Sequence, residues 1–281
     1  MEIFRHKNRN GYLAHQSRMA DVFNERQKHL EKKLHNLVAK KSDAIKGFSY
    51  PAKQEVDFQV HFNPNDLAAT NWRETLICPH THLNNRLRAC LEIIDCELEL
   101  YQDSPIYISE AVTPLFQYLD KRYTNIIGSE YISPNLKSGE TKKGIRHESL
   151  TDLSFQDNSF DAFMSFECLE HIPDYKKCLS ESYRTLKDGG SFFFSVPFRW
   201  DLEETLVRAK INAAGEIEHI LEPEYHGDPM QDQGCLCFYH FGWDILKLCE
   251  QAGFKDAYCI STWSDYNCNL GNDLLFFIAK K

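Results

Sequence analysis

The stretch SFDAFMSFECLEHIPDYKKCLSESYRTLKDGGSFFFSVPF, residues 159–198, decides the fold. It contains two apolar runs, Phe160–Phe166 and Ser191–Val196, each about the length of a buried strand. Between them apolar residues recur at helical spacing, with Asp174 as the expected N-cap and Gly189-Gly190 as the expected C-terminal cap. Strand, helix and strand in this order predict a right-handed β-α-β unit of a mostly parallel sheet.

A polar cluster follows the first of these strands directly. Glu167, Cys168, Glu170 and His171 lie between Phe166 and Ile172, with Leu169 among them. Open α/β sheets bind ligands in the crevice outside the carboxyl ends of their parallel strands. The sequence therefore predicts a ligand site at this strand end.

The amino-acid composition limits which classes of protein this chain can belong to. The 281 residues are 42% hydrophobic, which allows one large α/β domain with an extension or two small domains. The net charge is −9, but residues 1–46 carry 11 Lys and Arg against 5 Asp and Glu, so the rest is strongly acidic. An acidic body makes extended nucleic-acid binding unlikely to be the function, because phosphate contacts need clustered cations.

The N-terminal residues lack the apolar core of a secretory signal. No apolar run approaches the roughly 18 residues of a membrane span, so no membrane partner is expected. The ten cysteines are then best interpreted as reduced thiols of a cytoplasmic protein.

Residues 1–46 are expected to form a basic helical arm. Apolar residues recur at helical spacing over residues 12–40, with basic residues mostly on the opposite side. The helix could pack on its own domain or on a second subunit as a homodimer; an acidic partner, a nucleic acid or a membrane surface stay open. Residues 42–54, with Gly47 and Pro51, are interpreted as a linker.

Four separated motifs resemble one known family. SFD at 159–161, LEHIPD at 169–174, RTLKDGG at 184–190 and FFFSVP at 192–197 resemble class I S-adenosylmethionine-dependent methyltransferases, in this order and spacing. The resemblance implies a Rossmann-like α/β fold over residues 100–281: a seven-stranded, mostly parallel sheet with an antiparallel last hairpin. It also implies S-adenosylmethionine as cofactor and S-adenosylhomocysteine as product.

Residues 47–99 are expected to be a lead-in ending in a helix. The run WRETLICPHTHLNNRLRA, 72–89, resembles a zinc-ribbon-like module that precedes some of these methyltransferases. Thr81 stands where a partner of Cys78 is expected, and a structural zinc needs four ligands. A degenerate module without metal is therefore predicted. Arg86 and Arg88 are expected on a solvated face.

The resemblance also implies the cofactor-binding residues. The loop after the first strand of the core, SEAVTP at 109–114, lacks the glycines usual in the family, yet Glu110 could accept a hydrogen bond from the cofactor's ammonium group. Glu130 matches the family's ribose-binding carboxylate, and Ser149 and the Leu150 backbone stand where the adenine is bound. The complete expected set is Glu110, Ala111, Glu130, Tyr131, Ser149, Leu150, Glu167, Cys168 and His171.

A long insertion, about residues 199–240, follows the strand predicted at Ser191–Val196. In this fold such a segment lies over the cofactor cleft, so acceptor specificity is expected there. His226 and His240 are the candidate catalytic bases, because an unperturbed imidazole titrates near neutral pH. The expected substrate pocket consists of Phe198, Trp200, Tyr239 and Trp243, with no metal.

The sequence predicts transfer of a methyl group to an O or N atom of a small polar metabolite or sugar. A non-catalytic descendant that binds a ligand or partner remains an alternative, because the loop glycines and a carboxylate at Ser149 are missing. A nicotinamide-dependent oxidoreductase is a third possibility, although its glycine fingerprint is absent.

Overall fold

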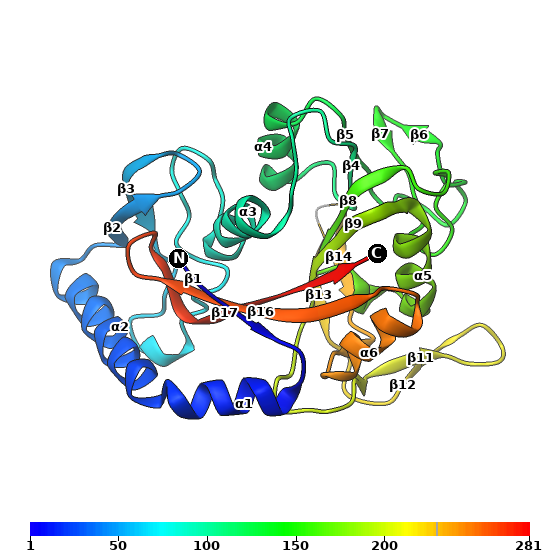
Figure 1. Cartoon of the computed structure of the whole chain (residues 1–281). Coiled ribbons are helices and arrows are strands. Elements are labelled where there is room, and N and C mark those ends of the chain that lie inside the picture. The colour runs from blue at the N-terminus through cyan, green and yellow to red at the C-terminus, as the bar shows by residue number, and fades with distance from the viewer. Residues whose placement is uncertain (229) are drawn as a thin grey trace. The chain divides into compact units, whose positions relative to one another are not determined.

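The computed structural model describes residues 1–228 and 230–281 (Figure 1). The chain forms two compact units. Unit 1 comprises residues 1–6, 10–99 and 260–275, and unit 2 comprises residues 7–9, 100–259 and 276–281. Each unit is described by itself.

A seven-stranded sheet has the order β1-β16-β17-β9-β8-β4-β5. Its strands are β1 (Glu2–His6), β4 (Ile106–Ile108), β5 (Ile126–Gly128), β8 (Phe160–Phe166), β9 (Leu186–Ser195), β16 (Asp256–Ser264) and β17 (Asn269–Lys280). In unit 2, β5, β4, β8 and β9 are parallel neighbours, and β17 runs antiparallel to β9. The expected Rossmann-like architecture, with the last strand reversed, is confirmed.

Burial explains why these apolar runs form strands. The three residues of β4 and the run Phe192–Phe194 of β9 are fully buried, as central strands covered on both faces must be. Phe194 stacks on Phe277 of β17 with ring centroids 5.1 Å apart. Helices α4 (Pro114–Arg122), α5 (Tyr175–Thr185) and α6 (Asp244–Gln251) belong to the same unit.

The predicted β-α-β unit is present, but its helix ends earlier than expected. Helix α5 stops at Thr185, and β9 already begins at Leu186, so Gly189 and Gly190 lie within the strand rather than capping the helix. Gly189 has a left-handed φ of +80°, and a Cβ on Gly190 would lie 2.9 Å from the Lys187 carbonyl oxygen. The glycine pair is therefore required by a tight bend at the start of β9.

The insertion after β9 consists of short antiparallel pairs. Strand β10 (Leu206–Val207) pairs with β15 (Tyr239–His240), β11 (Ala209–Ile211) with β12 (Ile217–His219), and β13 (Tyr225–Asp228) with β14 (Gln231–Leu236). A further hairpin, β6 (Thr141–Lys142) with β7 (Ile145–Arg146), precedes β8. Pro229, which lies within the predicted insertion, is outside the described residues.

The N-terminal helix is interrupted once. Helices α1 (Arg9–Arg18) and α2 (Ala20–Lys40) flank Met19. The segment expected to be a linker instead forms a hairpin of β2 (Ala44–Ser49) and β3 (Gln54–Gln59). Val56 and Phe58 are buried at alternate positions of β3, against Leu34 and other residues of α2. This apolar contact with the helix stabilises a segment of otherwise polar composition.

The rest of unit 1 is organised around α3 (Asn85–Glu97), preceded by the short helix η1 (Leu67–Ala69). The prediction that Arg86 and Arg88 lie on a solvated face is wrong. Arg88 has no exposed surface and donates hydrogen bonds to the carbonyl oxygens of Leu76 and Cys268, while Arg86 forms an ion pair with Glu74. Cys78 is buried and lies 3.3 Å from the Ser49 hydroxyl.

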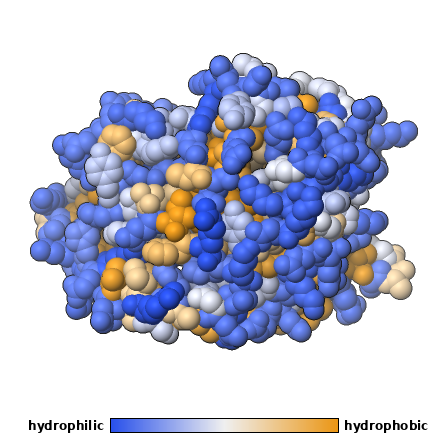
Figure 2. All heavy atoms as spheres, viewed as in Figure 1, coloured by the Kyte–Doolittle hydropathy of each residue, from blue (hydrophilic) through white to orange (hydrophobic). Residues whose placement is uncertain are grey.

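Hydrophilic residues predominate on the face drawn in Figure 2, in keeping with a net charge of −9. None of the helices in the described part of the chain combines the length and the apolar character that a bilayer span requires.

Candidate functional site

The order of strands in the sheet places a binding crevice at one edge of unit 2. From β4 the chain moves to β5 on one side and returns to β8 on the other. The carboxyl ends of β4 and β8 therefore flank the topological switch point, where open α/β sheets bind ligands. The two strand ends are joined, because Ser109 donates from its N–H to the Met164 carbonyl (3.0 Å) and from its hydroxyl to Ser165 (2.9 Å).

Glutamates follow three adjacent strands at this edge. Glu110 comes after β4, Glu130 after β5, and Glu167 and Glu170 after β8. Carboxylates gathered at one sheet edge attract a cation and repel an anion such as a pyrophosphate. The edge is therefore electrostatically suited to a positively charged ligand.

Glu130 organises the glycine-free loop after β4. Its Oε1 atom accepts hydrogen bonds from the backbone N–H groups of Ala111 (2.7 Å) and Val112 (3.2 Å). The Thr113 hydroxyl donates to Glu110 and accepts from the Phe116 N–H (3.2 Å), which caps α4. Two of the predicted cofactor residues are thus connected through this loop: Glu110 is part of it, and Glu130 after β5 accepts its backbone N–H groups.

Gly128 allows this loop to approach β5 closely. A Cβ at Gly128 would lie 2.6 Å from the Glu110 carbonyl oxygen and 2.5 Å from the Phe116 ring. The absence of a side chain is thus required on the strand next to the loop, whereas the loop itself contains no glycine.

Gly128→Ala is expected to destabilise the protein by roughly 1–3 kcal/mol, because a backbone carbonyl must move to admit the methyl group. Urea unfolding followed by circular dichroism measures the change. Gly227→Ala is the matched control, since no described atom lies within 4 Å of the added Cβ. Equal stability of the two variants would contradict the required close approach.

Tyr131 and Ser149 line a common pocket beyond β5. Before Leu150 the chain forms the short strand β7 and a parallel bridge between Glu130 and His147. The pocket has a volume of about 520 Å³ and is lined by Tyr131, Pro134, Leu136, Lys137, Ser138, His147, Ser149, Asp152, Leu153 and Ser154. The Ser149 hydroxyl lies 2.9 Å from that of Thr151, and Leu150 is buried.

Hydrogen bonds with β9 and with the insertion hold the residues after β8 in place. Glu167 has a left-handed φ of 51° and accepts a hydrogen bond from the Ser195 hydroxyl (2.7 Å). Burial raises the pKa of the Cys168 thiol to about 12, so this thiol is not a thiolate nucleophile at neutral pH. The ring of His171 is held through Nδ1, which donates to the Leu236 carbonyl (2.8 Å).

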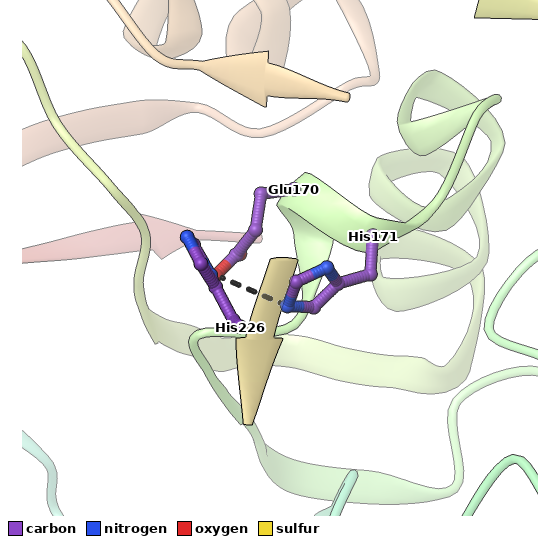
Figure 3. Close-up of side chains that lie close together, drawn as sticks. All are labelled: Glu170, His171 and His226. Atoms are coloured by element: carbon purple, nitrogen blue, oxygen red, sulfur yellow. Dashed lines mark ion pairs between the residues drawn. The ribbon is translucent and has the colours of Figure 1, made fainter. Parts of the chain in front are cut away.

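His226 and His240, the candidate bases, share one carboxylate. Glu224 Oε1 lies 2.9 Å from His226 Nε2 and 3.1 Å from His240 Nε2, and Glu224 Oε2 lies 3.1 Å from Arg208. On its other side, His226 Nδ1 lies 3.5 Å from Glu170 Oε1. Figure 3 shows Glu170 and His171 on the short helix η2 (Leu169–His171) pointing toward His226 on β13.

The electrostatics of this cluster are unusual. The pKa of His226 is raised to about 11, first by the contact of its ring with the Cys237 sulfur and then by the carboxylates of Glu170 and Glu224. Burial raises the pKa of the Glu170 carboxyl, which has no exposed surface. His226 therefore carries a proton at neutral pH when no other cation is present, which makes it a poor general base.

The four aromatic residues expected in the substrate pocket separate into two groups. Phe198 packs edge-on against Trp243 at 5.1 Å, and the Trp243 indole donates to the Trp200 carbonyl (2.8 Å). Tyr239 packs on Tyr175 with ring centroids 4.8 Å apart. Trp243 and Tyr239 are buried, whereas the Trp200 side chain is exposed.

Sequence reasoning did not single out Gly128 or Glu224, and it placed Glu170 in the polar cluster after Phe166 without giving it a role of its own. A signal exists for Glu224, which stands two residues before His226 on an extended segment and so shares a face with it.

Comparison with known proteins identifies part of unit 2. Residues 111–194 match the family model described as a methyltransferase domain. A Mycolicibacterium smegmatis protein named probable S-adenosylmethionine-dependent methyltransferase is 32% identical over 77 residues, covering 26% of this chain and 30% of that protein. The sarcosine/dimethylglycine N-methyltransferase of Aphanothece halophytica is 31% identical over 108 residues, covering 37% of this chain and 34% of that protein.

The chain thus spans about a third of the length of these curated relatives. A solved S-adenosylmethionine-dependent methyltransferase from Mesorhizobium loti is 16% identical, covers 70% of this chain and 96% of that one, and gives a TM-score of 0.41. The domain match confirms the predicted methyltransferase family for residues 111–194.

Proposed function

Residues 111–194 are a methyltransferase domain, and on that premise we propose that the chain is an S-adenosylmethionine-dependent methyltransferase. The observation that carries the proposal is the row of glutamates after β4, β5 and β8 at the switch point. S-adenosylmethionine carries a sulfonium and an ammonium group against one carboxylate, so it is a net cation. Carboxylates at the binding edge complement that charge.

In the proposed reaction, an O or N atom of the acceptor attacks the sulfonium methyl in line, and S-adenosylhomocysteine leaves. Because the methyl group is already activated by the positive sulfur, the protein contributes mainly alignment and exclusion of water. The acceptor is proposed to be a small polar metabolite or a sugar, bound under the insertion that follows β9.

Of the two candidate bases, His240 suits the role better than His226. His226 lies between two carboxylates that favour its protonated form, whereas His240 contacts only Glu224 among the described carboxylates. A carboxylate that orients an imidazole is the usual partner of a histidine base. The predicted homodimer and cytoplasmic location remain part of the proposal.

Thermal unfolding with S-adenosylmethionine, S-adenosylhomocysteine and NAD in parallel tests the cofactor. A ligand at about 100 times its dissociation constant stabilises a protein by roughly 2.7 kcal/mol, which raises the midpoint by several degrees. We expect a rise with the first two ligands and none with NAD. A rise with NAD alone would overturn the proposal.

One observation favours a second candidate, a methyltransferase fold that binds without catalysis. The proposed ribose carboxylate, Glu130, already accepts two backbone N–H groups of its own loop. Incubation with radiolabelled methyl donor and a panel of amines and hydroxylated metabolites separates the two, since only the enzyme transfers label.

A further inference from the structure

Three electron-rich atoms converge beside the switch point of unit 2. Glu170 Oε1 lies 3.6 Å from His171 Nε2 and 3.5 Å from His226 Nδ1, and the three atoms lie within 4.8 Å of one another (Figure 3). The Glu170 side chain has no exposed surface, and neither of its carboxylate oxygens forms a hydrogen bond with any described residue. A buried carboxyl group in this state either takes up a proton or needs a cation beside it to stay ionised.

The remaining ring nitrogens of both histidines are already in use. His171 Nδ1 faces the Leu236 carbonyl oxygen, which can only accept, so this nitrogen carries the proton. His226 Nε2 lies 2.9 Å from the Glu224 carboxylate and likewise donates. In their neutral tautomers both histidines therefore direct a lone pair at Glu170 Oε1, which is repulsive unless a cation lies between them.

The distances fit a common metal ion better than hydrogen bonds. Separations of 3.5 and 3.6 Å are longer than ordinary N–H···O hydrogen bonds. Ligand atoms held tetrahedrally at about 2.0–2.2 Å from one ion lie roughly 3.3–3.6 Å apart. The two separations involving Glu170 match that range.

We propose that Glu170, His171 and His226 bind a divalent transition-metal ion, with one coordination position open. Two imidazoles and one carboxylate suit ions such as Zn²⁺ or Fe²⁺ rather than Mg²⁺ or Ca²⁺. The site departs from the expectation, drawn from the sequence, that the protein holds no metal. His171 and Glu170 come from η2, and His226 comes from the insertion, so the ion would join the insertion to the carboxyl end of β8.

The surroundings supply the second layer that such ions need. Ligating histidines usually donate their other N–H to a carbonyl or a carboxylate, which fixes the ring and its tautomer. The Leu236 carbonyl does this for His171, and Glu224 does it for His226. Glu224 is itself held by Arg208 and His240.

Resting on the proposed function, the open position would take an oxygen of the methyl acceptor. A bound divalent ion stabilises the deprotonated form of a hydroxyl, which is the form that attacks a sulfonium methyl. The proposed acceptor is therefore a hydroxyl compound that binds the ion through the reacting oxygen alone. His240, outside the ligand set, stays available to take the proton.

Zinc titration of the chelator-treated full chain tests the site, read by calorimetry and by the thermal midpoint. We expect wild-type protein to bind one Zn²⁺ per chain with a raised midpoint, and Co²⁺ to give visible absorption. Glu170→Gln should weaken Zn²⁺ binding at least 100-fold, and Glu224→Gln should weaken it by about 10–100-fold. Glu218→Gln, an exposed glutamate of the insertion, is the matched control and should bind as wild type.

The midpoint without metal separates the two candidate cations. If Zn²⁺ is the natural partner, Glu170→Gln leaves the metal-free protein equally or more stable, because a buried charge is removed. If an imidazolium is the partner, the same change lowers the midpoint and wild-type protein shows no response to Zn²⁺; that result overturns the proposal. S-adenosylhomocysteine binding is measured in the wild-type protein and in each variant. If the wild-type protein does not bind S-adenosylhomocysteine, that result counts against the proposed function and not against the metal site.

Discussion

Replacing Glu130 with alanine is expected to weaken S-adenosylhomocysteine binding by roughly 100-fold, with calorimetry as the measurement. A carboxylate that accepts hydrogen bonds from both ribose hydroxyls provides about 1.5–3 kcal/mol for each bond, and 1.4 kcal/mol is a tenfold change in affinity. The variant also removes the acceptor of the Ala111 and Val112 N–H groups, so the loop after β4 loses its anchor.

Two companion variants separate ribose binding from the support of the loop. Glu130→Gln keeps a side-chain oxygen for the Ala111 N–H but loses the charge, so it should bind more weakly than wild type and more tightly than Glu130→Ala. Glu250→Ala on α6 is the matched control, because Glu250 is an exposed glutamate of the same unit. It should bind as wild type.

The ligand-free midpoints complete the experiment. A similar midpoint for Glu130→Ala and wild type, together with a large loss of affinity, assigns the effect to the ligand. Unchanged affinity in Glu130→Ala would remove the ribose assignment and would favour the non-catalytic candidate.

The parts of the fold that could be predicted are those with strong local signals. Strands β8 and β9 were predicted because each contains an apolar run of about the length of a buried strand, and α5 because its apolar residues recur at helical spacing. The hairpin of β2 and β3 was missed. Val56, Phe58 and Val60 do alternate in the sequence, but Gly47, Pro51 and the polar neighbours outweighed a pattern of only three residues.

The site could be predicted only in part, for a related reason. Residues that follow a strand directly, such as Glu130 and Glu167, were found because strand ends share one edge of a sheet. The association of Glu170 with His226 joins positions 56 residues apart through the conformation of the insertion, which no local pattern encodes. Gly128 was missed because the close approach of the loop after β4 is what requires a glycine at this position. Glycines were expected in that loop and not on the strand beside it.

Arg88→Ala is expected to destabilise unit 1 by about 3–5 kcal/mol, because it removes a fully buried cation together with the hydrogen bonds that it donates to two backbone carbonyl groups. The guanidinium donates to the carbonyl oxygens of Leu76 and Cys268, the second at 2.6 Å, and lies 4.0 Å from the centre of the Phe58 ring. Burial lowers the pKa of Arg88 to about 10, so it is still protonated at neutral pH. Urea unfolding, with amide hydrogen exchange to follow unit 1 alone, measures the loss.

Charge and volume are separated by a second substitution. Arg88→Met fills most of the space but donates no hydrogen bond, so it should recover only the part of the loss that comes from the cavity. Lys46→Ala is the control: the exposed Lys46 side chain pairs with the exposed Glu55 in the same unit, and surface pairs contribute little to stability.

The outcome also bears on how unit 1 is assembled. Leu76 and Cys268 are far apart in the chain, and Arg88 on α3 connects the segments that carry them. If Arg88→Ala lowers the stability no more than Lys46→Ala, the connection contributes nothing and the apolar cluster of Phe58, Leu76 and Cys268 must hold unit 1 by itself. If Arg88→Met is as unstable as Arg88→Ala, unsatisfied carbonyl groups rather than lost volume account for the cost, as expected for a cation that replaces water around buried backbone.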